Sequence, residues 1–152
     1  MKYQLPKDPE YRARIVMVDK DYTFVKQLAL VAKLFDIETA VFLDFQETLN
    51  YVSTRKVSTG SIDTTFLIEP VLRNSLLRQD LQEPSGADLI SSLYTLGVTP
   101  AQITFMSLYS VNELERCLHI FTPTMSKMYQ ERFLDKIRDV DGLFKLIEEC
   151  KG

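Results

Sequence analysis

The chain has 152 residues, which gives room for one domain of ordinary size. Hydrophobic residues make up 45% of the chain and charged residues 26%, a globular mixture that excludes wholesale disorder. The net charge of −3 gives no support to broad electrostatic binding of nucleic acid, and no apolar run is long enough to span a membrane.

Residues 1–13 contain two prolines and no apolar stretch that could act as a signal peptide, so we expect a short leader on a cytoplasmic protein. Residues 14–150 are expected to form a single domain. It begins with an apolar run at 14–19 that ends on Asp19 and is typical of a buried parallel strand. Apolar residues at helical spacing follow, and Asp21 is placed to cap that helix; the residues are Phe24, Leu28, Val31 and Phe35.

The alternation of apolar runs and amphipathic segments then repeats. Residues 37–43 predict a second strand, and Asp44 with Glu47 predicts a capped helix that continues to about Val52. The polar residues 53–63 predict a loop. A third strand is expected at 65–69, where it ends on Glu69 and is followed by Pro70.

The second half of the chain supplies the remaining elements. Residues 71–84 predict an irregular excursion, and Ser85 can cap a helix that Gly97 stops. A fourth strand at 103–107 is expected to precede a short helix at 110–117, a fifth strand at 118–122 and a long amphipathic helix from Tyr129 to Ile147. Five strands alternating with helices predict a flavodoxin-like α/β fold, a doubly wound parallel sheet in the order 2-1-3-4-5 with helices on both faces.

Few residues could support hydrolytic or zinc chemistry. The two cysteines, Cys117 and Cys150, lie far apart and lack a CxxC spacing, and His119 is the sole histidine. No nucleophile-elbow motif accompanies that histidine. We therefore do not expect an enzyme.

Parallel sheets of this kind bind ligands beyond the carboxyl ends of their strands, which makes the residues that end the strands candidate site residues. These residues are Asp19, Glu69 and Ser107. The stretches Ile-Val-Met-Val-Asp19, Phe-Leu-Ile-Glu69-Pro70 and Phe-Met-Ser107 resemble those of a response-regulator receiver domain of the CheY-like superfamily. The resemblance covers residues 14–148 and implies a role in two-component or phosphorelay signal transduction.

Receivers normally hold magnesium with two adjacent acids after the first strand and accept a phosphoryl group on an aspartate after the third strand. In this chain Asp19 matches the first acid, Lys20 stands at the second, and Glu69 stands at the phosphoacceptor position. An ammonium in place of a carboxylate removes a magnesium ligand, so we expect no metal and no other cofactor. Conventional aspartyl phosphorylation is not expected either, because the metal ion and the lysine that stabilise the charge developing during phosphoryl transfer would both be missing.

Receivers also bind the phosphate with a hydroxyl after the fourth strand and a lysine before a proline after the fifth. Ser107 matches the hydroxyl, whereas Thr122 stands where the lysine is expected, with Pro123 after it. His119 falls at the aromatic switch position of the fifth strand. It would titrate near neutral pH there, although simple packing at the sheet edge is the favoured interpretation.

Two hypotheses follow for the crevice at the carboxyl ends of the strands, where Asp19, Glu69 and Ser107 are expected to meet. In the first, Lys20 donates to Glu69 with Asp19 close by and so replaces the metal; the alternative is that Lys20 lies in solvent. In the second, the Glu69 carboxylate reaches toward Ser107 and partly imitates a phosphorylated residue.

We therefore expect an atypical, stand-alone pseudo-receiver that signals by protein–protein interaction. Its partner would be a histidine kinase or another signalling or output protein, docked on the face of the last two helices, and a homodimer is a further expectation. One alternative is a working receiver in which Asp21 or Glu69 supports weak phosphorylation. The other is a flavodoxin-like nucleotide or flavin binder, although a glycine-rich phosphate loop is missing after the first strand.

Overall fold

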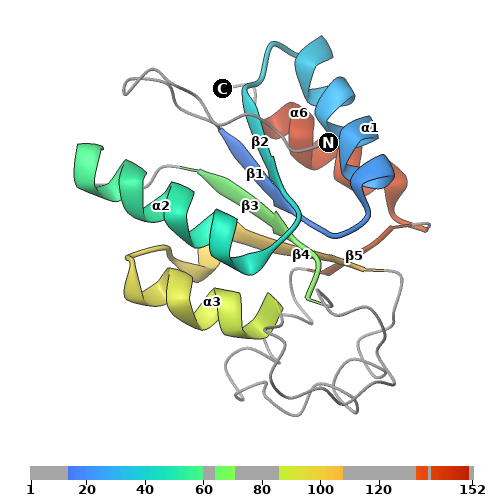
Figure 1. Ribbon diagram of the computed structural model, residues 1–152. Coiled ribbons are helices and arrows are strands. Elements are labelled where there is room, and N and C mark those ends of the chain that lie inside the picture. The colour runs from blue at the N-terminus through green and yellow to red at the C-terminus, as the bar shows by residue number, and fades with distance from the viewer. Residues whose placement is uncertain (1–13, 60–63, 71–85, 108–132, 137, 151–152) are drawn as a thin grey trace.

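A parallel sheet forms the centre of the protein, in a computed structural model that describes residues 14–59, 64–70, 86–107, 133–136 and 138–150. Its five strands lie in the order β2-β1-β3-β4-β5, which confirms the predicted flavodoxin-like α/β topology (Figure 1). The strands are β1 (Ile15–Val18), β2 (Thr39–Phe42), β3 (Thr65–Ile68), β4 (Ile103–Ser107) and β5 (Phe133–Asp135). Val18, at the end of β1, lies beside Phe42 of β2 and Ile68 of β3, so these three strands end at the same edge.

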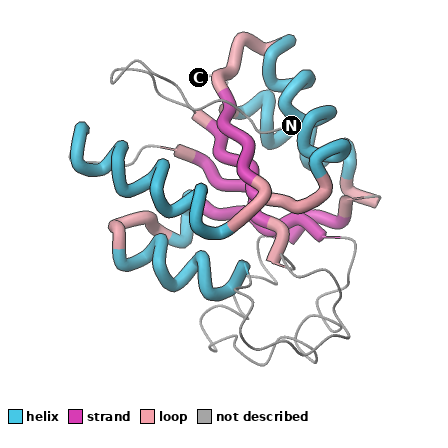
Figure 2. The backbone as a smooth tube through the Cα atoms, in the orientation of Figure 1, coloured by secondary structure: helices cyan, strands magenta, loops and turns pink. Residues whose placement is uncertain are grey.

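Helices cover both faces of the sheet, as expected for parallel strands that are buried on both sides (Figure 2). On one face lie α1 (Tyr22–Leu34) and α6 (Val140–Glu149), which pack against each other, and on the other lie α2 (Phe45–Thr59) and α3 (Gly86–Thr95) (Figure 1). A short 3₁₀-helix, η1 (Pro100–Gln102), leads into β4. Among the described residues, no helix is both long enough and apolar enough to cross a membrane.

Alternate residues of the central strand supply the two halves of the core. Val16 and Val18 of β1 are fully buried toward α2 and α3, whereas Ile15 and Met17 are buried toward α1 and α6. This is why β1 has a continuous apolar sequence instead of an alternating one. The same division continues through β3, where Phe66 and Leu67 lie in different halves of the core.

Capping side chains fix where the helices begin. The Asp21 carboxylate accepts a hydrogen bond of 3.1 Å from the Phe24 amide at the start of α1, and Asp44 accepts one of 2.8 Å from the Glu47 amide at the start of α2. Gly97 follows α3 with φ at 99°, a conformation that glycine adopts without strain. The caps predicted at Asp21 and Asp44 are confirmed.

Two of the predicted elements are wrong. Helix α2 continues to Thr59 where a loop was expected from residue 53, because Tyr51, Val52 and Arg55 keep a buried helical face against the core. Residues 133–135 form strand β5 instead of part of a long helix. Their pairing with the open edge of β4 outweighs a sequence spacing that also suits a helix.

Several predicted elements lie outside the described residues. These are the leader 1–13, the excursion 71–84 with the cap Ser85, the short helix 110–117 and the strand 118–122. The strand that pairs with β4 is β5, so the fifth strand of the sheet lies later in the chain than the sequence suggested.

Candidate functional site

Three polar residues meet where β1, β3 and β4 end. Asp19, Glu69 and Ser107 each sit at or just beyond the last residue of their strand, and the strand order places them side by side. All three are buried, with exposed fractions of 2%, 4% and 0%. The structure therefore brings together the three strand-end residues that the sequence singled out.

A fourth residue, Lys136, completes the cluster and was missed by the sequence analysis. Its backbone amide donates to the Ser107 carbonyl at 3.0 Å, which continues the β4–β5 ladder by one residue and fixes where the side chain starts. The Lys136 ammonium contacts Asp19 Oδ2 and lies 3.4 Å from Glu69 Oε2. The ring centroid of Phe24, in the first turn of α1, lies 5.0 Å from the same nitrogen.

Hydrogen bonds hold the two carboxylates in place. Ser107 Oγ donates to Glu69 Oε1 at 2.9 Å, and the Asp21 amide donates to Asp19 Oδ1 at 2.9 Å. One oxygen of each carboxylate is thus fixed by a neutral donor while the other faces the ammonium of Lys136. The arrangement stabilises two buried acids that would otherwise repel each other.

Burial and ion pairing both shift the pKa values of Asp19 and Lys136. Burial raises the pKa of Asp19 above its ordinary value of 3.8, although Lys136 and the Asp21 amide act in the opposite direction. For Lys136, burial lowers the pKa, but the attraction of Glu69 and Asp19 outweighs it and leaves the pKa above 10.5. The ammonium is therefore charged at neutral pH.

The residues predicted for the cationic positions need correction. The hypothesis that Lys20 fills the space of a metal is wrong in its choice of residue, because Lys20 is exposed and the buried ammonium between the acids belongs to Lys136. Thr122 and His119 lie outside the described residues, and the position after the strand beside β4 is held by Lys136. Receivers have a proline directly after this lysine. In this chain Pro123 follows Thr122, whereas Lys136 is followed by Ile137, so the proline pointed to the wrong position.

The donor set at this edge of the sheet is a poor match to magnesium, which needs near-octahedral oxygen ligands. Asp19 and Glu69 supply carboxylates, but both face the Lys136 ammonium, and the carboxylate of Asp21 caps α1. Across the described ranges, no group of three or more histidine, cysteine, aspartate or glutamate residues is arranged to hold a metal ion. We assign no metal-dependent step to these residues.

Comparisons with known proteins identify no family. No protein-family model matches the chain, and no curated protein matches it in sequence. Among solved structures, one similar chain is described as a trimeric coiled-coil segment of yeast Spc42, amino acids 181–211, fused to another structure. Its TM-score is 0.57 at 13% identity, over 90% of this chain and 77% of that one.

A second similar structure is the adenylate cyclase from Rhodopirellula baltica. The TM-score is 0.54 at 16% identity, and the match covers 93% of this chain and 90% of that one. At such low identities these matches support the fold alone, so the function has to be inferred from the residues of the site.

Proposed function

We propose that this chain is a receiver-like signalling domain that acts through contact with another protein, without magnesium-dependent aspartyl phosphorylation. The observation that carries the proposal is the position of the Lys136 ammonium between the carboxylates of Asp19 and Glu69. Lys136 follows the fifth strand, where a receiver carries its phosphate-binding lysine, and here its ammonium is already paired with both acids. This one ammonium offsets one of the two carboxylate charges, and the exposed Lys20 stands in sequence where a receiver has its second magnesium-binding acid.

The environment of Glu69 argues against its use as a nucleophile. Its side chain is buried, Oε1 accepts the Ser107 hydrogen bond, and Oε2 faces Lys136. Attack on phosphorus would require an oxygen to leave these contacts and become accessible to a phosphodonor. Glutamate is also one methylene longer than aspartate, a displacement on the order of 1 Å that costs roughly a hundredfold in rate.

The contact between Ser107 and Glu69 supports a more specific proposal. In receivers the corresponding hydroxyl binds the phosphoryl group, and here it donates to the carboxylate of the residue at the phosphoacceptor position. Glu69 would then hold β4 and β3 together as a phosphate does, with one negative charge where a phosphate brings nearly two. The domain would be permanently in a partly activated arrangement and ready to bind its partner.

The test is to incubate the protein with a small phosphodonor and magnesium and to measure its intact mass. We expect no gain in mass from the wild-type chain. A clean gain of one phosphate, mapped to Glu69 or Asp21, would overturn the proposal and favour a working phosphorelay receiver. A receiver with an unmodified acidic pocket, treated in parallel, shows that the phosphodonor is active.

A further inference from the structure

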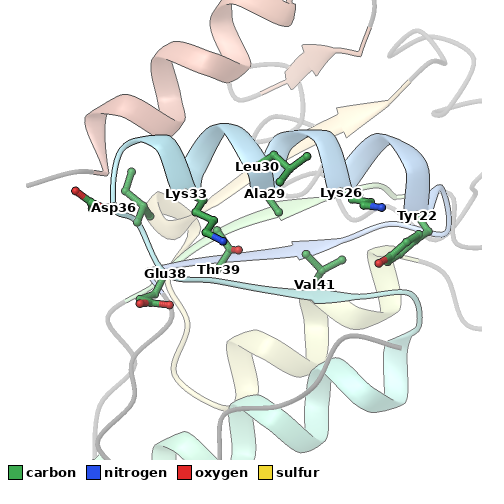
Figure 3. Close-up of a pocket in the computed structure, with 10 residues that line it drawn as sticks. Tyr22, Lys26, Ala29, Leu30, Lys33, Asp36, Glu38, Thr39 and Val41 are labelled. Atoms are coloured by element: carbon green, nitrogen blue, oxygen red, sulfur yellow. The ribbon is translucent and has the colours of Figure 1, made fainter. Parts of the chain in front are cut away.

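The two edge strands of the sheet are held in different ways. All four residues of β2 are buried, and this strand lies against α1, whose side chains line a groove of about 530 Å³ beside it (Figure 3). Strand β5 has three residues, all of them only half-buried, and among the described strands it pairs with β4 alone. A short strand with little buried surface is the kind of element that opens without unfolding the rest of a protein.

The chain that follows β5 is held independently of the sheet. The Asp135 amide donates to Asp139 Oδ2 at 2.8 Å, and the Arg138 amide donates to Asp135 Oδ1 at 2.9 Å. Neither bond involves β4. Helix α6, which comes next, packs in the core through Leu143 and Ile147, both fully buried. Strand β5 can therefore leave β4 while this turn and α6 stay in place.

Lys136 connects β5 to the strands beyond β4. Its ammonium contacts Asp19, just after β1, and lies 3.4 Å from Glu69 Oε2, just after β3. Its backbone amide donates to the Ser107 carbonyl of β4 at 3.0 Å. Movement of β5 away from β4 withdraws the ammonium and leaves two neighbouring buried carboxylates without their cation, which is costly. The two acids therefore favour the paired position of β5.

We propose that β5 opens locally from β4 and that the charges of Asp19 and Glu69 set the population of the open state. In the closed state the Lys136 ammonium pairs with both acids, and in the open state β5 uncovers the edge of β4. The two states differ in the surface beside α6, so a protein that contacts this region distinguishes them. This last step rests on the proposed function, whereas the opening itself does not. The mass measurement described above and the exchange measurement below therefore succeed or fail independently.

Asp19→Asn separates local opening from overall stability. Asparagine keeps the size of the side chain and removes one of the two charges that attract the Lys136 ammonium. It also removes the repulsion between Asp19 and Glu69 that appears when the ammonium leaves, so both changes favour opening. Burial raises the pKa of Asp19, so a neutral side chain at this position should not lower the free energy of global unfolding. We expect easier opening of β5 without a loss of global stability.

The experiment is native-state amide hydrogen exchange of the full chain, followed by NMR at several low concentrations of urea. The Lys136 amide, bonded to Ser107, reports on β5, and the Glu69 amide, which donates to the Val18 carbonyl at 2.9 Å, reports on the centre of the sheet. Local opening exposes little surface, so exchange at Lys136 should depend weakly on urea and exchange at Glu69 strongly. Asp19→Asn should accelerate exchange at Lys136 about tenfold or more, with no acceleration at Glu69.

A second variant and a matched control accompany Asp19→Asn. Glu69→Gln keeps an acceptor for the Ser107 hydroxyl and removes the other charge that attracts Lys136, so it should also accelerate exchange at the Lys136 amide. Asp36→Asn is the control, because it makes the same change as Asp19→Asn at an exposed residue beyond the end of α1 (Figure 3). Asparagine tolerates the φ of 59° at this position, so exchange at both amides should stay unchanged.

Three results would each overturn the proposal. If the Lys136 and Glu69 amides share one urea dependence, β5 opens only when the whole chain unfolds. If Asp19→Asn leaves exchange at Lys136 unchanged, the charges of the acids do not control the opening. If Asp36→Asn accelerates exchange as much as Asp19→Asn does, the effect does not come from the contact with Lys136.

Discussion

The ammonium of Lys136, just after β5, lies against the carboxylate of Asp19, just after β1. Two strands, β3 and β4, separate β5 from β1 in the sheet, so the lysine side chain extends across their ends and passes Glu69 on the way. A buried ammonium is costly unless it is paired, and two carboxylates pair this one. This contact therefore connects the last strand of the sheet to its centre and gives Lys136 a structural role.

Replacement of Lys136 should be strongly destabilising. Lys136→Met keeps the length and the apolar stem of the side chain but leaves Asp19 and Glu69 buried without their cation. Breaking a buried ion pair in this way costs about 3–5 kcal/mol. The free energy of unfolding in urea, compared with that of the wild-type chain at neutral pH, measures the loss.

Lys20→Ala is the matched control, because Lys20 is an exposed lysine next to Asp19 in sequence. We expect it to change the free energy of unfolding by no more than about 0.5 kcal/mol, the usual effect of a surface substitution. If Lys20→Ala proved as damaging as Lys136→Met, the assignment of the buried cation to Lys136 would be wrong.

The contribution of Lys136 should disappear at alkaline pH. Burial lowers the pKa of Lys136, but Glu69 and Asp19 raise it further, so the folded protein binds the lysine proton more tightly than the unfolded chain does. The stability that Lys136 contributes is therefore fully present below 10.5 and is lost as the pH rises from there through the folded-state pKa. The gap in unfolding free energy between wild type and Lys136→Met should narrow over that window, and a constant gap would contradict the prediction.

Asp19 should titrate above the ordinary range of an aspartate. Because burial raises its pKa above 3.8, the folded chain holds this proton more tightly than the unfolded chain does. The protonated Asp19 carboxyl therefore adds to the free energy of unfolding at low pH. This contribution is lost as the pH rises from 3.8 through the folded-state pKa of Asp19. Carboxyl ¹³C chemical shifts of Asp19 measure the titration directly.

The same titration in the Lys136→Met variant supplies the control. Removing the ammonium removes the principal attraction that lowers the Asp19 pKa, so Asp19 should then titrate at still higher pH. A downward shift in the variant would mean that Lys136 does not stabilise the ionised carboxylate.

The fold could be predicted from the sequence where local patterns and burial agree. The third and fourth strands were placed within one residue, because a strand buried on both faces needs the continuous apolar run that Phe66 and Phe105 belong to. Strand β5 could not be found this way. It has three residues, all of them only half-buried, and its spacing from Tyr129 also fits a helix. Its identity depends on pairing with β4, which no local pattern reveals.

The sequence predicted three of the four residues of the candidate site. Asp19, Glu69 and Ser107 follow directly from the rule that strand ends gather at one edge of a parallel sheet. The fourth member could not be assigned, because its position depends on where the fifth strand lies. Without β5, Thr122 before Pro123 was the closer match to the expected pattern, and Lys136 was left inside a predicted helix.

Loss of the Ser107 hydroxyl should destabilise the protein, because it removes the hydrogen bond to Glu69. Ser107→Ala removes the donor of the 2.9 Å hydrogen bond to Glu69 Oε1 in a site without solvent exposure. A buried acceptor that loses its donor costs about 1–3 kcal/mol. Ser91→Ala, an exposed serine on α3, is the matched control and should stay within about 0.5 kcal/mol of wild type in urea unfolding. Equal effects of the two substitutions would exclude a stabilising role for the Ser107 contact.

The last prediction is a gain of metal binding. The double variant Lys20→Asp with Glu69→Asp removes an exposed ammonium beside Asp19, adds a carboxylate there, and shortens the acid after β3. Oxygen ligands of this kind are those that magnesium prefers. We expect isothermal titration with magnesium to detect binding by the double variant and none by the wild-type chain.

A control variant separates a local site from a change in overall charge. Lys26→Asp with Glu69→Asp makes the same changes of residue type but places the new carboxylate on α1, in the groove beside β2. It should bind magnesium no better than wild type, because the added charge lies away from Asp19. Binding by the control would show that magnesium responds to net charge, and binding by wild type would show that the Lys136 cluster leaves room for the ion.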